Sequence, residues 1–145
     1  MSETLISKPL TRFPSVANLG RAALVTGLTA LVAVAAVRLL AGALVEAPAG
    51  YEPFQWGALI AATLVGVVAA TAAYAALTRF TRQGERNYLL LGYAFLAFSM
   101  VGPLLGPANN SPPGTTWPLA VVLVALHLAA GLPALHLMGR LAREA

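Results

Sequence analysis

Three ionisable side chains fall inside the apolar stretches of the sequence, and they are the residues best suited to chemistry. Arg38 lies in the first stretch, and His127 and His136 lie in the last. Ionisable groups inside a bilayer are costly and rare, so they commonly mark ligand paths, proton relays or ion sites. These three side chains could therefore attract an anion, bind a ligand or exchange a proton.

Arg38 permits two interpretations. It follows Arg21 by about 25 Å of helix, which places it in the outer third of the first stretch. It could attract an anion or orient a substrate near the outer mouth. Alternatively, it extends outward to the interface, toward Glu46 or Glu52 of the first outer loop. The second interpretation is favoured because the interface is within about 10 Å of the side chain.

His127 lies near the middle of the last stretch, about 15 Å beyond Trp117. Ser99 reaches a similar depth in the third stretch, where Pro103 would free its carbonyl from the helix. One hypothesis is a site here that binds a ligand or handles protons. The favoured hypothesis is a neutral histidine that is hydrogen-bonded across helices. The candidate partners of His127 are Ser99, Thr26, Thr29 and Thr63, and Tyr74 is the candidate partner of His136.

The residue types that are missing exclude several kinds of chemistry. The sequence contains no cysteine and no aspartate, and its five glutamates lie outside the apolar stretches. Disulfides, thiolate metal sites and a Ser-His-Asp triad are therefore excluded. The two histidines lie nine residues apart, so a helix would turn them to opposite faces and prevent a haem pair. We expect no enzyme activity, no cofactor and no metal site.

The composition indicates a membrane protein. Among 145 residues, 59% are hydrophobic and 10% are charged, and the mean hydropathy is +0.77. A soluble domain carries roughly 25% charged residues. Four apolar stretches cover about residues 22–45, 54–78, 88–105 and 117–138. They predict an all-α fold, a four-helix transmembrane bundle with antiparallel up-down-up-down order, in one integral membrane domain spanning residues 1–145.

Basic residues predict the orientation of this bundle. They precede the first stretch, separate the second from the third and follow the fourth, at Lys8, Arg12, Arg21, Arg79, Arg82, Arg86, Arg140 and Arg143. The other two loops contain no lysine or arginine. The positive-inside rule then predicts that both termini lie in the cytoplasm. The net charge of +4 reflects this bias, and we expect no nucleic-acid partner.

Tryptophans and arginines form a weak repeat. Trp56 opens the second stretch and is followed by Arg79 and Arg82; Trp117 opens the fourth and is followed at the same spacing by Arg140 and Arg143. A duplicated helical hairpin would produce this pattern. Interfacial anchoring would also produce it, because tryptophan favours the interfaces and arginine the cytoplasmic side. We favour the second explanation and interpret these six residues as interfacial anchors.

Three segments carry a resemblance to a known family. They are RAALVTGLTALVAVAAVRLL, YEPFQWGAL and the closing WPLAVVLVALHL with LARE. With them the chain resembles the uncharacterised four-pass bacterial membrane proteins that are grouped as a domain of unknown function, over residues 21–144. The resemblance implies four membrane spans and brings no activity or site residues. The predominance of arginine over lysine, with abundant alanine and glycine, is also typical of a high-GC bacterial gene. We therefore expect the protein in the bacterial plasma (inner) membrane, with both termini inside.

The function expected from these features is non-catalytic. We predict an accessory, assembly or structural component that works through helix packing in the lipid bilayer, with larger membrane-complex subunits as partners. Small residues at helical spacing favour this reading, including Ala62, Gly66 and Ala70. We also expect the packing of the four helices to depend on Gly66 and Gly131, which lie on such stripes. The alternative is a small solute or ion conduit that works as a homo-oligomer, with Arg38 and His127 along the path.

Overall fold

The computed structural model describes residues 13–143, which fold into helices and short connections without a strand. Lys8 and Arg12, which contribute to the predicted orientation, lie outside the described residues. The elements are α1 (Val16–Leu44), η1 (a 3-10 turn, Glu52–Phe54), α2 (Trp56–Phe80), α3 (Gly84–Ser99), α4 (Val101–Asn109) and α5 (Trp117–Arg143).

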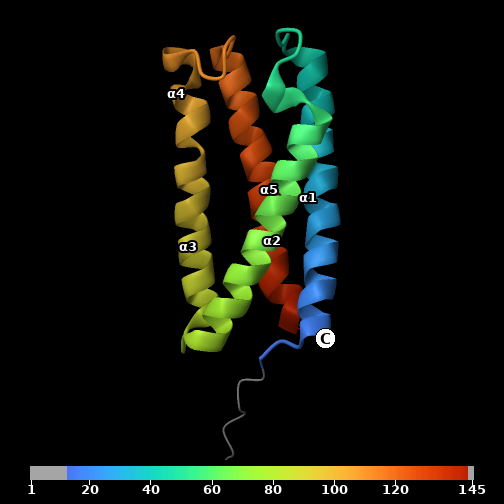
Figure 1. Cartoon of the computed structure of the whole chain (residues 1–145), viewed down its shortest axis with the longest axis vertical. Coiled ribbons are helices and arrows are strands. Elements are labelled where there is room, and N and C mark those ends of the chain that lie inside the picture. Colours follow the sequence, from blue (N-terminus) through green and yellow to red (C-terminus); the bar gives the residue numbers. More distant parts are fainter. Residues whose placement is uncertain (1–12, 144–145) are drawn as a thin grey trace, which may run out of the picture.

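These elements confirm a four-helix bundle. Within residues 13–143, four helical segments are long and apolar enough to cross a membrane, and α3 and α4 together form one of them. Their bounds are Val16–Leu44, Trp56–Phe80, Gly84–Asn109 and Trp117–Arg143. The chain runs up and down, so that α1 begins and α5 ends at the same end of the bundle (Figure 1). We call that end the terminal end. The opposite end, which holds residues 45–55 and 110–116, is called the loop end.

The helices differ from the apolar stretches mainly at their ends. α1 begins six residues before residue 22, where the Ser15 side chain accepts a hydrogen bond from the Asn18 N–H at 3.2 Å and caps the helix. α5 continues to Arg143, beyond the predicted end at residue 138. Hydropathy marks the part of a helix that suits hydrocarbon, whereas backbone hydrogen bonding continues into the polar residues at the interface. The helices are therefore longer at these ends than the apolar stretches predicted from the sequence.

The third span is interrupted at Met100, between α3 and α4. Pro103 has no N–H, so the Ser99 carbonyl lacks the donor that a regular helix would supply. The helix resumes at Val101 and continues to Asn109, past the predicted end at residue 105. The sequence therefore predicted the span and the carbonyl that Pro103 frees, but it did not predict that the helix is interrupted at Met100.

α5 is the central helix of the bundle and contacts α1, α2, α3 and α4. Ala120 and Met138 of α5 are completely buried, as are Ala22, Thr26 and Ala30 of α1. Small side chains allow the two backbones to approach closely. The first and last helices of the chain therefore pack against each other along the bundle, as Figure 1 shows.

α3 and α5 lock together through two reciprocal contacts between a glycine and a leucine. A Cβ atom on Gly92 of α3 would lie 2.1 Å from Leu135 Cδ2 of α5. A Cβ atom on Gly131 of α5 would lie 2.6 Å from Leu96 Cδ1 of α3. Each leucine therefore occupies the space that the absent glycine side chain leaves on the other helix.

Two clusters of buried side chains hold the bundle together, one near each end. The cluster at the terminal end contains Ala22, Tyr74, Tyr88, Leu96, Leu135, Met138 and Ala142. The cluster at the loop end contains Val34, Ala41, Tyr51, Phe54, Leu119, Leu123 and Leu126. Both take residues from α5, which fits the central position of that helix.

The small residues predicted to pack on the second span lie mostly on the outside. Ala62 and Gly66 of α2 are exposed, Ala70 is only half-buried, and a Cβ atom on Gly66 would meet no atom within 4 Å. α2 instead packs into the bundle through Thr63, Val67 and Tyr74. The expectation that this stripe supports packing within the chain was wrong, because the buried face of α2 is turned away from it.

Candidate functional site

Arg38 is held in a fixed position at the loop end. Its Nε–H donates to the carbonyl oxygen of Phe54 at 2.9 Å. The guanidinium carbon lies 4.7 Å from the centre of the Phe54 ring and 5.8 Å from that of the Trp56 ring. A cation close to an aromatic ring is attracted by the electron-rich face. The side chain therefore links α1 to η1 and to the start of α2.

Space for the guanidinium is left by Gly42, one turn further along α1. A Cβ atom on Gly42 would lie 2.8 Å from Arg38 Nη1. A side chain at this position would therefore push the guanidinium aside. Arg38 also lines a cavity of about 200 Å³ that is open to the surface, together with Ala47, Pro48, Gly50, Tyr51, Phe54 and Gln55.

The partner predicted for Arg38 differs from the one observed. Within residues 13–143, neither Glu46 nor Glu52 lies within ion-pair distance of the guanidinium. The side chain does lie near the loop end, but it bonds to a backbone carbonyl and to aromatic rings. Both glutamates are exposed to solvent, where hydration competes with an ion pair. The predicted contact with either glutamate was wrong.

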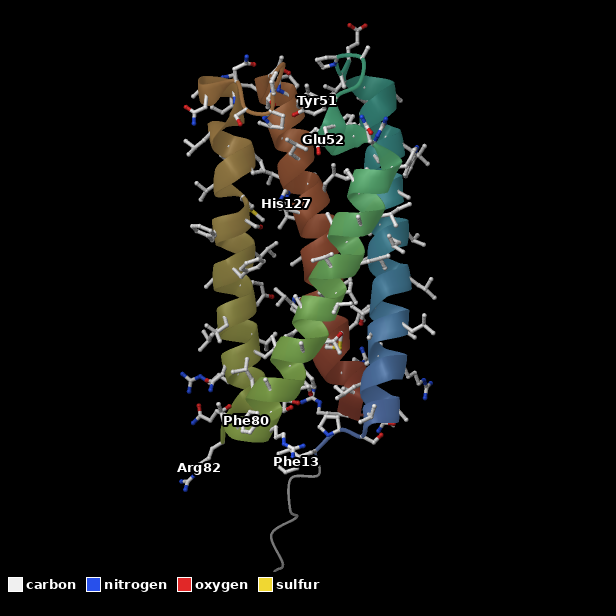
Figure 2. The ribbon with its side chains drawn as sticks, in the orientation of Figure 1. Phe13, Tyr51, Glu52, Phe80, Arg82 and His127 are labelled. Atoms are coloured by element: carbon white, nitrogen blue, oxygen red, sulfur yellow. The ribbon has the colours of Figure 1, made fainter. Side chains whose placement is uncertain are left out.

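His127 lines a separate and larger groove. The groove has a volume of about 410 Å³ and is lined by Pro53, Gly102, Pro103, Leu105, Gly106, Asn109, Ser111, Pro112, Leu123 and His127. Figure 2 shows His127 on α5, between α2 and the helices of the third span. Nδ1 of the ring donates to the Leu123 carbonyl at 2.7 Å, because a carbonyl oxygen can only accept. In a neutral ring Nε2 is then an acceptor.

The predicted bonds of His127 across helices are not formed. The hydroxyls of Ser99, Thr29 and Thr63 instead donate to carbonyls of their own helices, at 2.7, 2.9 and 2.7 Å. Thr26 Oγ1 is buried without a hydrogen-bond partner among the residues that the structure describes. Serine and threonine in helices readily bond to the preceding turn. This local bond, and that of His127 to Leu123, replaced the predicted contacts.

His136 also has a different partner from the one predicted. Its Nε2 lies 2.7 Å from the hydroxyl oxygen of Tyr93 on α3, and the two rings meet edge to face. Tyr74 instead donates toward Glu85 Oε1 at 3.2 Å and lies 3.4 Å from the Gly139 carbonyl. The rotation of α5 about its axis decides which tyrosine meets His136, and spacing along the chain cannot give that rotation.

The predicted interfacial anchors lie at the two ends of the bundle. Trp56 and Trp117 are the first residues of α2 and α5 at the loop end, and both are exposed. Arg79, Arg82, Arg140 and Arg143 are exposed residues toward the terminal end, where Figure 2 shows Arg82 beyond the end of α2. Arg143 also forms an ion pair with Glu85 of α3. It therefore joins two helices, a role that the prediction of a simple anchor missed.

Tyr51 and Thr115 form a link between the two loops that the sequence reading did not identify. Both are buried, and their hydroxyl oxygens lie 2.8 Å apart. Thr115 donates its proton to the Pro112 carbonyl at 2.6 Å, so Tyr51 is the donor in their shared bond. No spacing in the sequence marks this pair, because the two residues lie 64 positions apart. The Tyr51 ring also meets the Phe54 ring edge to face, with their centres 5.5 Å apart.

The structure thus does not join Arg38, His127 and Ser99 in one site. Arg38 lines the 200 Å³ cavity, His127 lines the 410 Å³ groove, and Ser99 bonds within α3. Comparisons with curated proteins and with solved structures gave no significant match. A family model of unknown function matches residues 11–144, nearly the whole chain. On this match, the chain belongs to the family of unknown function DUF6069.

Proposed function

We propose that this protein is a non-catalytic accessory, assembly or structural component of the bacterial plasma (inner) membrane. Both termini lie in the cytoplasm, and the loop end faces outward. The protein acts by packing an exposed face of α2 against a transmembrane helix of a larger membrane-complex subunit.

The observation that carries the proposal is the distribution of small residues on α2. Ala62, Gly66, Ala69 and Ala73 are all exposed, and they lie within a narrow arc of the helix. We call these four residues the small-residue face. Their spacing repeats the small-xxx-small pattern, which lets two membrane helices approach until their backbones are in contact.

Small residues on α1 show how such a face packs when another helix covers it. Ala22 and Ala30 of α1 are completely buried against the rest of the bundle. The flank of α2 opposite the small-residue face carries larger exposed side chains, including Leu64 and Val68. Large aliphatic side chains are suited to lipid, whereas a row of small ones gains most from close contact with a helix. This contrast supports a helix as the partner of the small-residue face.

Site-specific crosslinking in native membranes tests the proposal. A photo-crosslinking residue at position 66 should form an adduct with a second polypeptide, and one at position 64, on the opposite flank, should not. In addition, Gly66→Leu should abolish an adduct formed from position 62, because the larger side chain prevents close approach. Adducts of equal yield from positions 66 and 64 would contradict a specific interface, and so would no adduct from position 66.

The alternative is a solute or ion conduit built from several copies of this chain. The groove beside His127 supports it, since another copy packed there would turn an open groove into an enclosed path. In that case a photo-crosslinking residue at position 105, an exposed position in the groove, would form adducts only with another copy of this chain. A different polypeptide in the adduct from position 66 supports the accessory role instead.

A further inference from the structure

We propose that Arg38 and the 200 Å³ cavity beside it bind the phosphate of a membrane phospholipid in the leaflet at the loop end. This goes beyond helix packing, because it assigns a ligand to a part of the molecule that the small-residue face does not include.

The first argument is the way Arg38 is held. The Nε–H is occupied by the Phe54 carbonyl, and the guanidinium lies close to the Phe54 and Trp56 rings. Within residues 13–143, no hydrogen bond from the Nη1 or Nη2 groups is formed. Arginine binds phosphate with two parallel N–H groups of its planar fork. A fork that is already fixed in position loses little freedom when it binds such a ligand.

The second argument is charge. No carboxylate in the described range 13–143 pairs with Arg38, although the side chain is only partly exposed and lies near the apolar part of α1. A cation at the edge of hydrocarbon is costly unless an anion or water compensates it. A phosphate beside the guanidinium would supply that compensation without moving any part of the bundle.

The third argument is size and depth. Ligand pockets for drug-sized molecules have volumes of about 300–1,000 Å³, so a cavity of about 200 Å³ suits a headgroup better than a whole solute. The guanidinium lies beside the ring of Trp56, the first residue of α2. Tryptophan prefers the headgroup level of a membrane, which is also where lipid phosphates lie.

The surrounding charge favours a lipid over a phosphate from solution. The residues that connect α1 to α2 carry Glu46 and Glu52, both exposed, and no lysine or arginine. These two carboxylates would repel a soluble anion on its approach from water. A phospholipid reaches the cavity sideways, within the leaflet, and its chains hold the phosphate at the required depth.

Quenching of Trp56 fluorescence tests the proposal on the full chain in detergent. The chain has two tryptophans, so a Trp117→Phe background makes Trp56 the only reporter. The probes are phosphatidylglycerol with bromine near the ester end of its acyl chains, diacylglycerol with the same brominated chains, and inorganic phosphate as a competitor. We expect saturable quenching by the phospholipid, at least tenfold weaker quenching by the diacylglycerol, and no displacement by inorganic phosphate at equal concentration.

Variants of Arg38 then test whether the quenching by the phospholipid depends on this side chain. Arg38→Gln should raise the half-quenching concentration of the phospholipid about tenfold, as expected for loss of a charge-assisted contact. Arg38→Lys should fall between Arg38→Gln and the parent, because it keeps the charge but loses the fixed fork. Arg79→Gln, at the opposite end of α2, is the matched control and should behave like the parent.

Gly42→Ala keeps the test decisive if Arg38→Gln fails to fold. It retains the charge, but its Cβ atom would meet Nη1 at 2.8 Å and displace the fork, so the half-quenching concentration should rise. Parental affinity in Gly42→Ala, or in folded Arg38→Gln, would overturn the proposal. Equal quenching by the diacylglycerol would exclude phosphate recognition. Displacement by inorganic phosphate at equal concentration would assign the site to a soluble anion and also overturn the lipid assignment.

Discussion

Tyr51 gives the clearest test of a single side chain, because its hydroxyl is the buried link between the two loops at the loop end. Tyr51→Phe keeps the ring against Phe54 and removes the bond to Thr115. We expect a loss of about 1 kcal/mol in the free energy of unfolding, the usual net value of one buried hydrogen bond. Unfolding in mixed detergent micelles, followed by circular dichroism, measures it.

A double-mutant cycle with Thr115→Val isolates this bond. If the hydroxyls interact as described, the double variant should lose less than the sum of the two single variants. Tyr93→Phe is a suitable control for the loss of a tyrosine hydroxyl, because Tyr93 is exposed and bonds to the exposed His136. It should cost less stability than Tyr51→Phe. Additive losses from Tyr51→Phe and Thr115→Val would show that the loops are not joined through this contact.

For single side chains, the sequence predicted which residues would be polar within the membrane better than it predicted the groups that they contact. Arg38 and His127 could be found because a charged or ionisable residue is conspicuous within an apolar stretch. Their contacts could not be found, because Arg38 bonds to a backbone carbonyl of Phe54 that only the folded loop brings near. His127 likewise bonds to the preceding turn of its own helix. Backbone acceptors are present at every residue, so no residue type marks the one that is used.

Glycines allow a test at the scale of whole helices, because two of them lie in opposite environments. Gly131→Leu should place a side chain where Leu96 already lies, with a cost of about 1–3 kcal/mol for overpacking. Gly66→Leu should leave the stability of the isolated chain nearly unchanged, since the space beside Gly66 is open. Thermal unfolding in the same detergent compares the two variants directly.

Each variant is a matched control for the other, because both replace a glycine by a leucine within a membrane helix and differ only in position. A loss of stability in Gly66→Leu equal to that in Gly131→Leu would mean that α2 turns its small-residue face into the bundle. Parental stability in Gly131→Leu would mean that α3 and α5 are not interlocked.

The position of each helix along the chain could be predicted from the sequence, but not which of its faces is turned toward the other helices. A run such as 22–45, in which Arg38 is the one charged residue, is long and apolar enough to predict a membrane helix. Uniform apolarity, however, removes the difference between a core face and a lipid face. On α2, Gly66 and Val67 are neighbours of similar apolar character, yet Gly66 is exposed and Val67 is buried. The shapes of the facing helices decide between them, and the hydropathy pattern along the chain does not reveal those shapes.

Across the whole molecule, the two ends differ in charge. The terminal end has exposed arginines at positions 21, 79, 82, 86, 140 and 143. The loop end has Glu46 and Glu52 beyond the helices, with Arg38 turned toward aromatic rings. Figure 2 shows Arg82 and Glu52 at these opposite ends. A bundle with arginines gathered at one end is oriented by them during insertion.

We therefore predict that the terminal end is cytoplasmic. The chain has no cysteine, so single cysteines can report on each side without background labelling. Suitable sites are Ala49→Cys and Ala108→Cys near the loop end and Gln83→Cys near the terminal end, because all three residues are exposed and uncharged. A membrane-impermeant maleimide should label the first two in intact spheroplasts and should label Gln83→Cys only after permeabilisation. The opposite pattern would place the termini outside. Labelling of all three in sealed spheroplasts would mean that the chain inserts in both directions, and that the arginines do not determine its orientation.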